Sequence, residues 1–292
     1  MDDSKRFHTP LRYPGGKGKF ASFVKKLMEL NNIKGAHYLE PYAGGAGVAL
    51  DLLYSNYCTD IHINDYDQAI FHFWQAVTQN TEDFLKLLVD TPITISEWEK
   101  QKLVLSKPEE FGDLKHGFAA FFLNRTNRSG ILKGGVVGGK NQNGRYKLDA
   151  RFQKPNLIKR IEKIGQHASR IHVTNKDALE LIKQVDKILP NNSLIYLDPP
   201  YYLKGQGLYR NFYEHEDHEL IREALNHVRT RWIVSYDNCE PIKKIYHGYR
   251  QDEYSLNYSA YVKTKGSEVM IYCDELKVLS TDSPLNQLQL AV

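Results

Sequence analysis

The sequence predicts an α/β protein in which one core, built on a largely parallel sheet, is interrupted by a mostly helical insertion. Strand-like segments occur near both ends of the chain, helical periodicity dominates between about residues 66 and 123, and a basic, glycine-rich segment follows. One interrupted core explains this order better than two consecutive domains. We therefore expect a core at 1–66 and 165–279, an insertion at 67–164 and a loosely held tail at 280–292.

The amino-terminal part reads as a strand, a glycine loop, a helix and a second strand. After a helix expected at Phe20–Leu30, the strands are His37–Glu40 and Ile61–Asn64, and the helix between them is Val48–Tyr54. This unit is typical of the opening of a parallel sheet.

The carboxyl-terminal part contains three further strand-like runs and a hairpin. The runs are Arg170–Val173, Ser193–Leu197 and Trp232–Ser235, with a helix at His218–Val228. In the hairpin, strands Tyr258–Lys263 and Glu268–Cys273 flank a turn at Thr264–Gly266. In the insertion, aromatic residues such as Phe73 and Phe84 recur at helical spacing, which indicates core packing.

Positive charge is concentrated in one segment. Between Arg125 and Lys163 there are eleven basic and two acidic residues, a net charge of +9, whereas the whole chain carries +4 and the remainder therefore −5. A local basic block in an otherwise acidic chain indicates a face for a polyanion, although a solvated charged surface is the simpler alternative.

The loop Glu40-Pro41-Tyr42-Ala43-Gly44-Gly45-Ala46-Gly47 lies between a predicted strand and a predicted helix. Glycines there allow a sharp turn and close approach of a ligand, and Asp65, at the end of the next strand, suits ribose hydroxyls. The loop has neither the spacing of a dinucleotide site nor the Gly-Lys-Ser/Thr of a phosphate loop. A cofactor with a ribose but no pyrophosphate fits better, and S-adenosylmethionine is one; a mere tight turn is the alternative.

A second loop, Arg12-Tyr13-Pro14-Gly15-Gly16-Lys17, is another place of close approach. Lys17 offers a flexible cation suited to a carboxylate, such as the one at the methionine end of that cofactor. A turn with a surface lysine explains the motif equally well.

Asp198-Pro199-Pro200-Tyr201 follows an apolar strand at its carboxyl end, where α/β sheets bind ligands. The amine of adenine is a poor nucleophile, and acceptors on its two N–H bonds free its lone pair; the Asp198 carboxylate and the Pro199 carbonyl can be these acceptors. The prolines stiffen the loop, and Tyr201 offers a ring for stacking an extruded base. Methyl transfer needs alignment and no metal, so we expect His215 and His218 to lie at a solvated helix start capped by Asp217.

Cys58, Cys239 and Cys273 form no Cys-x-x-Cys pair, which predicts buried or half-buried thiols in a reducing compartment. None follows a proline, which argues against the thiolate chemistry of cytosine-C5 methylation. The start, MDDSKRFHT, has no apolar run, and we expect a cytoplasmic protein without a membrane segment.

Together these motifs resemble the Dam-like, D12-class (α group) DNA adenine-N6 methyltransferases. The resemblance rests on RYPGGK at 12–17, EPYAGGAG at 40–47, IND ending at Asp65, NRTNRSG at 124–130 and LDPPY at 197–201. It spans about Leu11 to Cys273. Tyr13 stands where tryptophan is common, and Arg128-Ser129-Gly130 replaces a frequent Tyr-Asn-Gly, which leaves the target sequence open.

The resemblance implies a Rossmann-like, S-adenosylmethionine-dependent methyltransferase fold whose insertion recognises DNA. It implies that catalysis uses Asp198, Pro199, Pro200 and Tyr201. The cofactor contacts would be Tyr13, Lys17, Glu40, Tyr42, Gly44, Gly45, Gly47, Asp65, Asp177 and Asp198. The DNA contacts would be Asn124, Arg125, Arg128, Lys133, Lys140, Arg145 and Lys147.

We therefore expect a site-specific methyltransferase that transfers a methyl group to adenine N6 in double-stranded DNA by base flipping. It would act as a monomer, in a bacterial or phage setting, with a cognate restriction endonuclease as a possible partner. Methylation of RNA or of cytosine N4, and a catalytically silent DNA-binding relative, are the alternatives.

Overall fold

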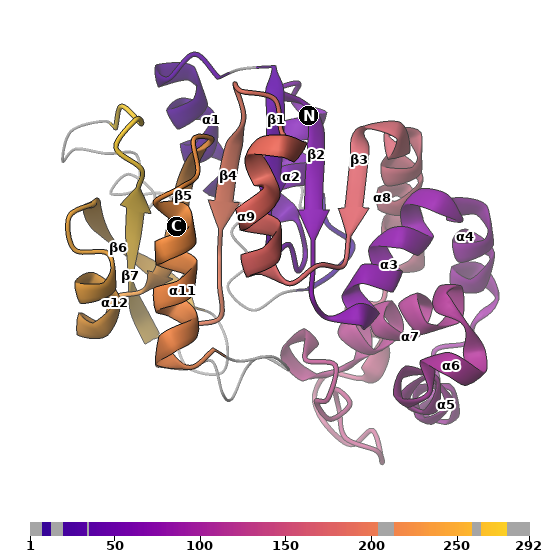
Figure 1. The fold of residues 1–292 in the computed structure, drawn as a ribbon. Helices are drawn as coiled ribbons and strands as arrows, with labels where there is room; N and C mark the ends of the chain where they lie inside the picture. The colour runs from indigo at the N-terminus through magenta and orange to yellow at the C-terminus, as the bar shows by residue number, and fades with distance from the viewer. Residues whose placement is uncertain (1–7, 13–19, 34, 204–212, 259–263, 279–292) are drawn as a thin grey trace. The chain divides into compact units, whose positions relative to one another are not determined.

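The computed structural model describes residues 8–12, 20–33, 35–203, 213–258 and 264–278, and Figure 1 shows its fold. The expected α/β class is confirmed. The chain forms two compact units: the sheet unit comprises residues 17–66 and 176–292, and the helical unit comprises residues 1–16 and 67–175.

Six of the described strands belong to the sheet unit, in the order β2-β1-β4-β5-β7-β6. Their bounds are β1 Ala36–Glu40, β2 Cys58–Asn64, β4 Leu194–Leu197, β5 Arg231–Asp237, β6 Arg250–Tyr258 and β7 Thr264–Tyr272. β1 pairs in parallel with β2 and β4, and β4 with β5. Strand β7 is antiparallel to both β5 and β6. The carboxyl ends of the parallel strands therefore meet at one edge of the sheet.

The central strand β4 is apolar along its whole length because both of its faces are covered. All four of its residues are buried, as is usual for a strand inside a parallel sheet. The sequence that follows, from Asp198 onward, is thus delivered to the sheet edge by a rigid element.

Helices cover both faces of this sheet. They are α1 Ala21–Leu30, α2 Gly47–Tyr54, α9 Ala178–Ile188, α11 His215–Leu225 and α12 Glu240–Ile245. In Figure 1, α9 and α11 lie in front of the strands, whereas α1 and α2 lie behind them.

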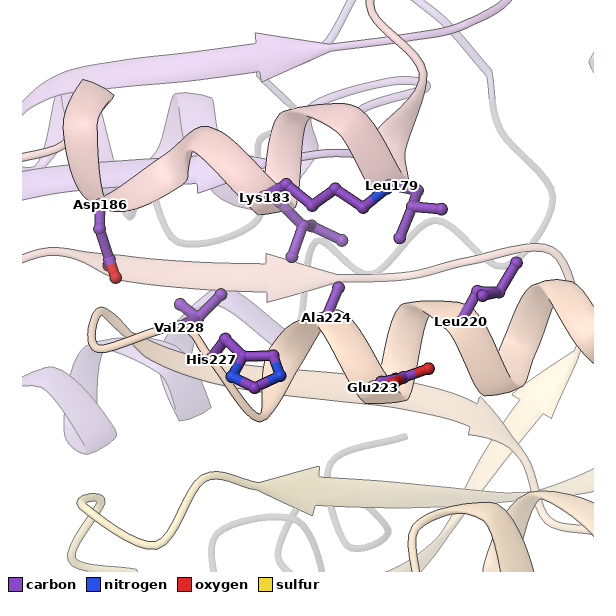
Figure 2. Close-up of a pocket in the computed structure, with 9 residues that line it drawn as sticks. Leu179, Lys183, Asp186, Leu220, Glu223, Ala224, His227 and Val228 are labelled. Carbon is purple, nitrogen blue, oxygen red and sulfur yellow. The ribbon is translucent and has the colours of Figure 1, made fainter.

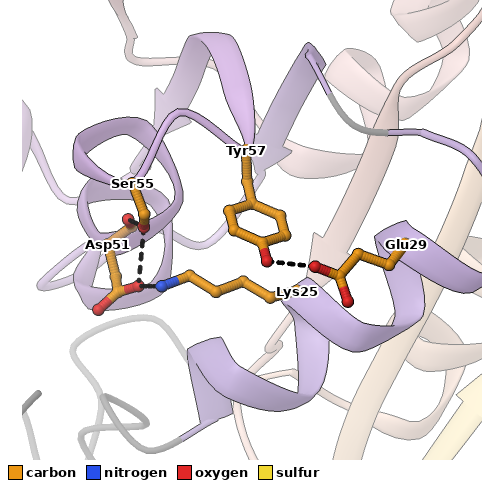
Figure 3. Close-up of polar contacts among 5 residues, drawn as sticks. All are labelled: Lys25, Glu29, Asp51, Ser55 and Tyr57. Carbon is orange, nitrogen blue, oxygen red and sulfur yellow. Dashed lines mark hydrogen bonds and ion pairs between the residues drawn. The ribbon is translucent and has the colours of Figure 1, made fainter.

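Polar contacts connect α1 with α2 and the turn after it (Figure 3). Lys25 of α1 pairs with Asp51 of α2, and its ammonium lies 5.4 Å from the centroid of the Tyr57 ring. The Tyr57 hydroxyl donates to Glu29 of α1. Half-buried pairs of this kind contribute modestly to stability, and here they fix the helix that follows the glycine loop.

The terminal hairpin differs from its prediction. A hairpin is present, but its strands are Arg250–Tyr258 and Thr264–Tyr272, so Thr264–Gly266 belongs to a strand instead of a turn. The connection falls at 259–263, outside the described residues. The pattern misled because the sequence of β6, RQDEYSLNY, is mostly polar.

The helical unit is built around aromatic side chains. Its elements are α3 Gln68–Gln79, α4 Thr81–Asp90, α5 Ile95–Ser106, α6 Pro108–Phe111, α7 Asp113–Thr126, α8 Lys154–Gln166 and β3 Ile171–Thr174, with short 3-10 turns at Arg128–Gly130, Leu148–Arg151 and Ala168–Arg170. Phe73, Phe84 and Phe121 are buried, and their ring centroids lie 5.5–5.9 Å apart. The prediction that the aromatic residues form a core is confirmed for these rings.

Close approach of α3 and α7 requires a glycine. A Cβ at Gly117 would lie 2.4 Å from the backbone oxygen of His72, a distance that real side chains do not adopt. None of the helices in the described part of the chain is both long enough and apolar enough to cross a bilayer. Cys58, Cys239 and Cys273 are buried and form no disulfide with one another, and the prediction of buried thiols is confirmed.

Candidate active site

The glycine loop brings two of the predicted cofactor residues together. The Gly44 N–H donates to Asp65 Oδ2 at 2.9 Å, so the acid at the end of β2 lies against the loop after β1. Gly44 has a φ of +46°, and Ala46, which precedes α2, has a φ of +46° as well. A left-handed alanine costs roughly 1–2 kcal/mol and persists only where its surroundings hold it, often at a ligand site.

Glu40 lies beneath this loop. Its side chain is 5% exposed, and Oε1 accepts from the Tyr38 hydroxyl at 3.1 Å and from Ala49 N–H at 3.0 Å. The carboxyl group therefore ties the first turn of α2 to β1. The hydroxyl of Tyr42 lies 3.0 Å from that of Tyr213. The proposed contacts of Glu40 and Tyr42 with a cofactor stay predictions.

Asn64 holds the loops around this position, a role that was not predicted from the sequence. It is fully buried and donates through Nδ2 to the carbonyls of Pro41 at 2.9 Å and Lys176 at 3.0 Å. Its Oδ1 accepts from Lys176 N–H at 2.8 Å, and its own carbonyl accepts from Ala43 N–H at 2.9 Å. One side chain thus fixes the glycine loop against the segment that enters α9.

Asp177 caps α9. Its Oδ1 accepts from Leu179 N–H at 2.9 Å and Glu180 N–H at 3.3 Å, the usual geometry of an N-cap. A capping role is sufficient to explain this residue, so its contact with a cofactor stays a prediction. Tyr13 and Lys17, the other predicted cofactor residues of the first loop, lie outside the described residues.

Asp198 is oriented by a chain of hydroxyl groups. Ser235 of β5 donates through Oγ to Asp198 Oδ1 at 2.9 Å, and the Tyr196 hydroxyl lies 2.9 Å from the same Oγ. Because the serine proton is committed to Asp198, Tyr196 must be the donor in the second bond. A hydrogen bond to a charged carboxylate is among the stronger ones, so the half-buried Asp198 side chain is held in one orientation.

The turn after the tetrapeptide is held by Asp237, at the end of β5. Its carboxylate accepts from Tyr202 N–H at 2.8 Å and from Leu203 N–H at 2.9 Å. Pro199 and Pro200 are buried. Ser235 and Asp237 were not predicted from the sequence, although both lie in the last three residues of β5, whose carboxyl end is at the sheet edge that carries Asp198.

The helix start at His215 differs from its prediction. Glu214 is the N-cap, and Asp217 accepts from the Glu214 N–H within a capping box. His218 is fully buried instead of solvated; its Nδ1 lies 3.0 Å from the Tyr236 hydroxyl, and burial lowers the pKa of the imidazole to about 4. His218 is therefore a neutral core residue at pH 7.

The predicted DNA contacts of the helical unit fall into two groups. The side chains of five are exposed: Arg128, Lys133, Lys140, Arg145 and Lys147. By contrast, Asn124 is 1% exposed, and its side chain holds the backbone of Arg12. Its Oδ1 accepts from the Arg12 N–H at 2.7 Å. Its Nδ2 donates to the carbonyls of Arg12 and Gly130, at 2.8 and 2.9 Å. This placement favours a structural role for Asn124.

Arginine side chains gather in the same unit. Arg125, Arg151 and Arg160 line a cavity of about 160 Å³, and burial, with repulsion from Arg12, Arg160 and Arg151, lowers the pKa of Arg125 to about 9. The Nη1 atom of Arg12 is buried without a hydrogen-bond partner. Arg125 and Arg160 donate to the carbonyls of Arg151 and Thr9, at 2.7 and 2.8 Å. None of these four arginines forms an ion pair with a carboxylate of the described chain. For the half-buried Arg12, Arg125 and Arg160 this is costly unless an anion joins them.

A larger cavity of about 390 Å³ lies between α9 and α11 (Figure 2). Its lining includes Leu179, Lys183, Leu220 and His227. None of the predicted catalytic or cofactor residues lines it, so it is not the site built around Asp198.

Comparison with known proteins identifies the class. Residues 13–260 match the family of D12 class N6 adenine-specific DNA methyltransferases, and the chain belongs to this family. The methyl donor is therefore S-adenosylmethionine, and the expected Rossmann-like methyltransferase core is confirmed in the sheet unit.

Individual proteins similar to this chain share little sequence identity with it. Over 206 residues the chain is 25% identical to the type II methyltransferase M.MjaIII of Methanocaldococcus jannaschii, covering 65% of this chain and 68% of that protein. Among solved structures, Sp1610 of Streptococcus pneumoniae has 10% identity and a TM-score of 0.38, covering 90% of this chain and 76% of its own. TrmK of M. capricolum has 10% identity and a TM-score of 0.32, covering 86% and 69%. These TM-scores are too low to support an argument.

Proposed function

We propose that the protein methylates N6 of adenine at a defined sequence in double-stranded DNA, and that the adenine leaves the helix to reach Asp198. The observation that carries the proposal is the fixed carboxylate of Asp198. It stands at the end of the central strand β4 and accepts a hydrogen bond from Ser235 at 2.9 Å.

The chemistry follows from what the tetrapeptide can accept. The lone pair of the adenine amine is delocalised into the ring, and acceptors on both N–H bonds make the nitrogen a better nucleophile. Asp198 provides a carboxylate, and Pro199, which has no N–H, provides a carbonyl on a stiff backbone. Their contribution is alignment of the amine.

The residues near the glycine loop fit the cofactor. S-adenosylmethionine supplies an electrophilic methyl group on a sulfonium. The Asp65 carboxylate lies against the Gly44 backbone, where an acid at the end of the second strand meets ribose hydroxyls. Asp65 and the loop at 40–47 would hold the adenosine part, and Lys17 would meet the carboxylate of the methionine part.

The helical unit supports a polyanionic substrate. Its exposed basic residues between Lys133 and Lys147, and the four arginines that have no acidic partner, suit DNA phosphates. Tyr146 is 55% exposed, with the guanidinium groups of Arg145 and Arg151 at 5.4 and 5.9 Å from its ring centroid. We infer that this surface contacts DNA. A monomeric state and a cognate restriction endonuclease as partner are part of the same proposal; the relative M.MjaIII is a type II methyltransferase.

The product identifies the reaction. Unmethylated DNA and, in a parallel reaction, RNA are incubated with the protein and S-adenosylmethionine, digested to nucleosides and analysed by mass spectrometry. N6-methyldeoxyadenosine is expected. Formation of N4-methyldeoxycytidine, or methyl transfer to RNA alone, would contradict the proposal. Absence of any methyl transfer would favour a DNA-binding protein without catalytic activity.

A further inference from the structure

A buried acid on β7 lies next to the tyrosine of the catalytic tetrapeptide. Glu268 is 1% exposed, and its Oε1 accepts from the Tyr201 hydroxyl at 2.7 Å. Its Oε2 accepts from the hydroxyl of Tyr254 on β6. We propose that Glu268 is a positioning residue, which fixes the long axis of the Tyr201 side chain, and with it the position of the ring, for stacking on the extruded adenine. This inference rests on the proposed function, because only a base-stacking role gives the position of the ring a catalytic meaning.

The burial of Glu268 indicates that the contact is specific. A buried carboxyl group costs free energy unless its oxygens accept hydrogen bonds, and an apolar side chain of similar size would often serve the fold equally well. Here each oxygen accepts one tyrosine hydroxyl. The acid therefore joins two rings whose orientation it sets.

The other end of Tyr201 is fixed by the neighbouring strand. Asp237 of β5 is directly opposite Glu268 of β7 in the antiparallel register. It accepts from the N–H groups of Tyr202 and Leu203, at 2.8 and 2.9 Å. Paired acids on adjacent strands thus hold the backbone after Tyr201 and the hydroxyl at the far end of its ring.

Fixing both ends removes most of the freedom of the ring. The backbone places the Cα atom, and the hydroxyl lies on the long axis of the side chain, so a bond at the hydroxyl suppresses the swing between rotamers. A ring that is already aligned can receive the base without ordering at the moment of reaction, and misplacement by about 1 Å can cost on the order of a hundredfold in rate.

The test compares two substitutions that each remove one hydroxyl from the same acid. Tyr201→Phe keeps the ring but removes the hydroxyl that donates to Glu268. Tyr254→Phe is the matched control, because it removes the other hydroxyl that donates to Glu268 and lies outside the catalytic tetrapeptide. At saturating DNA and S-adenosylmethionine we expect Tyr201→Phe to lower kcat about tenfold, with unchanged cofactor binding, and Tyr254→Phe to change kcat by less than about twofold.

Substitutions of the acid complete the test. Glu268→Ala is expected to lower kcat by the same factor as Tyr201→Phe. The double variant Tyr201→Phe/Glu268→Ala should have the same kcat as either single variant, because both substitutions remove the same hydrogen bond. Glu268→Gln keeps an acceptor oxygen and should recover most of the loss. If Glu268→Ala does not fold, Tyr201→Phe, Tyr254→Phe and the nearly isosteric Glu268→Gln carry the comparison of kcat, and thermal denaturation of Tyr201→Phe and Tyr254→Phe measures the stability that each hydroxyl contributes without turnover.

The outcomes separate the two proposals. If the wild-type protein forms no N6-methyladenine, the proposed function fails and the positioning role falls with it. If the wild-type protein is active but Tyr201→Phe and Tyr254→Phe lower kcat equally, in step with their melting temperatures, Glu268 supports only the fold. Additive losses in the double variant would likewise overturn the inference.

Discussion

Ser235 offers the sharpest test of how the site is organised. Ser235→Ala removes the donor to Asp198 Oδ1 and the acceptor of the Tyr196 hydroxyl, both at 2.9 Å. A hydrogen bond to a charged group contributes about 1.5–3 kcal/mol. If that energy is what keeps Asp198 aligned, its loss corresponds to a fall in kcat of about ten- to a hundredfold, since 1.36 kcal/mol is about a factor of ten.

The same substitution also affects stability, which allows the two roles to be separated. Tyr196 is 3% exposed, and Ser235→Ala removes the acceptor that lies 2.9 Å from its buried hydroxyl, a loss that costs about 1–3 kcal/mol. Tyr196→Phe is the matched control, because it leaves the bond from Ser235 to Asp198 intact. Steady-state methyl transfer and denaturant unfolding are measured for both variants, and we expect kcat to fall mainly in Ser235→Ala. Equal kcat values in the wild type and Ser235→Ala would refute the argument that Ser235 orients Asp198.

Three further predictions concern the rest of the molecule. Because burial lowers the pKa of His218 from 6.5 to about 4, the unfolded state binds the extra proton between these values. Stability should therefore fall by about 3 kcal/mol as pH drops from 6.5 to 4, and this fall should be missing in His218→Gln unfolded by urea over the same range. Gly117→Ala should destabilise by about 1–3 kcal/mol through overpacking, whereas Gly135→Ala, where a Cβ meets nothing within 4 Å, should be nearly neutral; equal melting temperatures would contradict this. Arg145→Ala should reduce the slope of the logarithm of DNA affinity against the logarithm of salt concentration by about one. Substitution of the exposed Lys183 of α9 by alanine is the control and should leave this slope unchanged. An unchanged slope in Arg145→Ala would show that Arg145 does not contact DNA.

The elements that sequence analysis predicted best are those with a local signal. The apolar run Leu194–Leu197 predicted a strand, which is confirmed. The order of strand, glycine loop, helix and strand placed Gly44 and Asp65 in one unit, and a hydrogen bond joins them. Both signals lie within one strand–loop unit, where chain connectivity limits the possible geometry.

The residues that sequence analysis missed act across long distances in the chain. Asn64 holds Lys176, Ser235 orients Asp198, and Glu268 binds Tyr201. Each pair is brought together by strand order, which no local pattern encodes. The polar strand β6 was missed for a different reason, since its pairing with β7 is not marked by an apolar run.

The most direct test of the central claim is DNA sequencing with detection of methylated bases. The protein and its Asp198→Ala variant are expressed in cells that lack adenine methylation, with Ser235→Ala as an intermediate case. We predict N6-methyladenine in one recurring sequence context with the wild-type protein, less with Ser235→Ala, and none with Asp198→Ala, which should remain folded. Methylation of cytosine N4, or adenine methylation that persists in Asp198→Ala, would contradict the account.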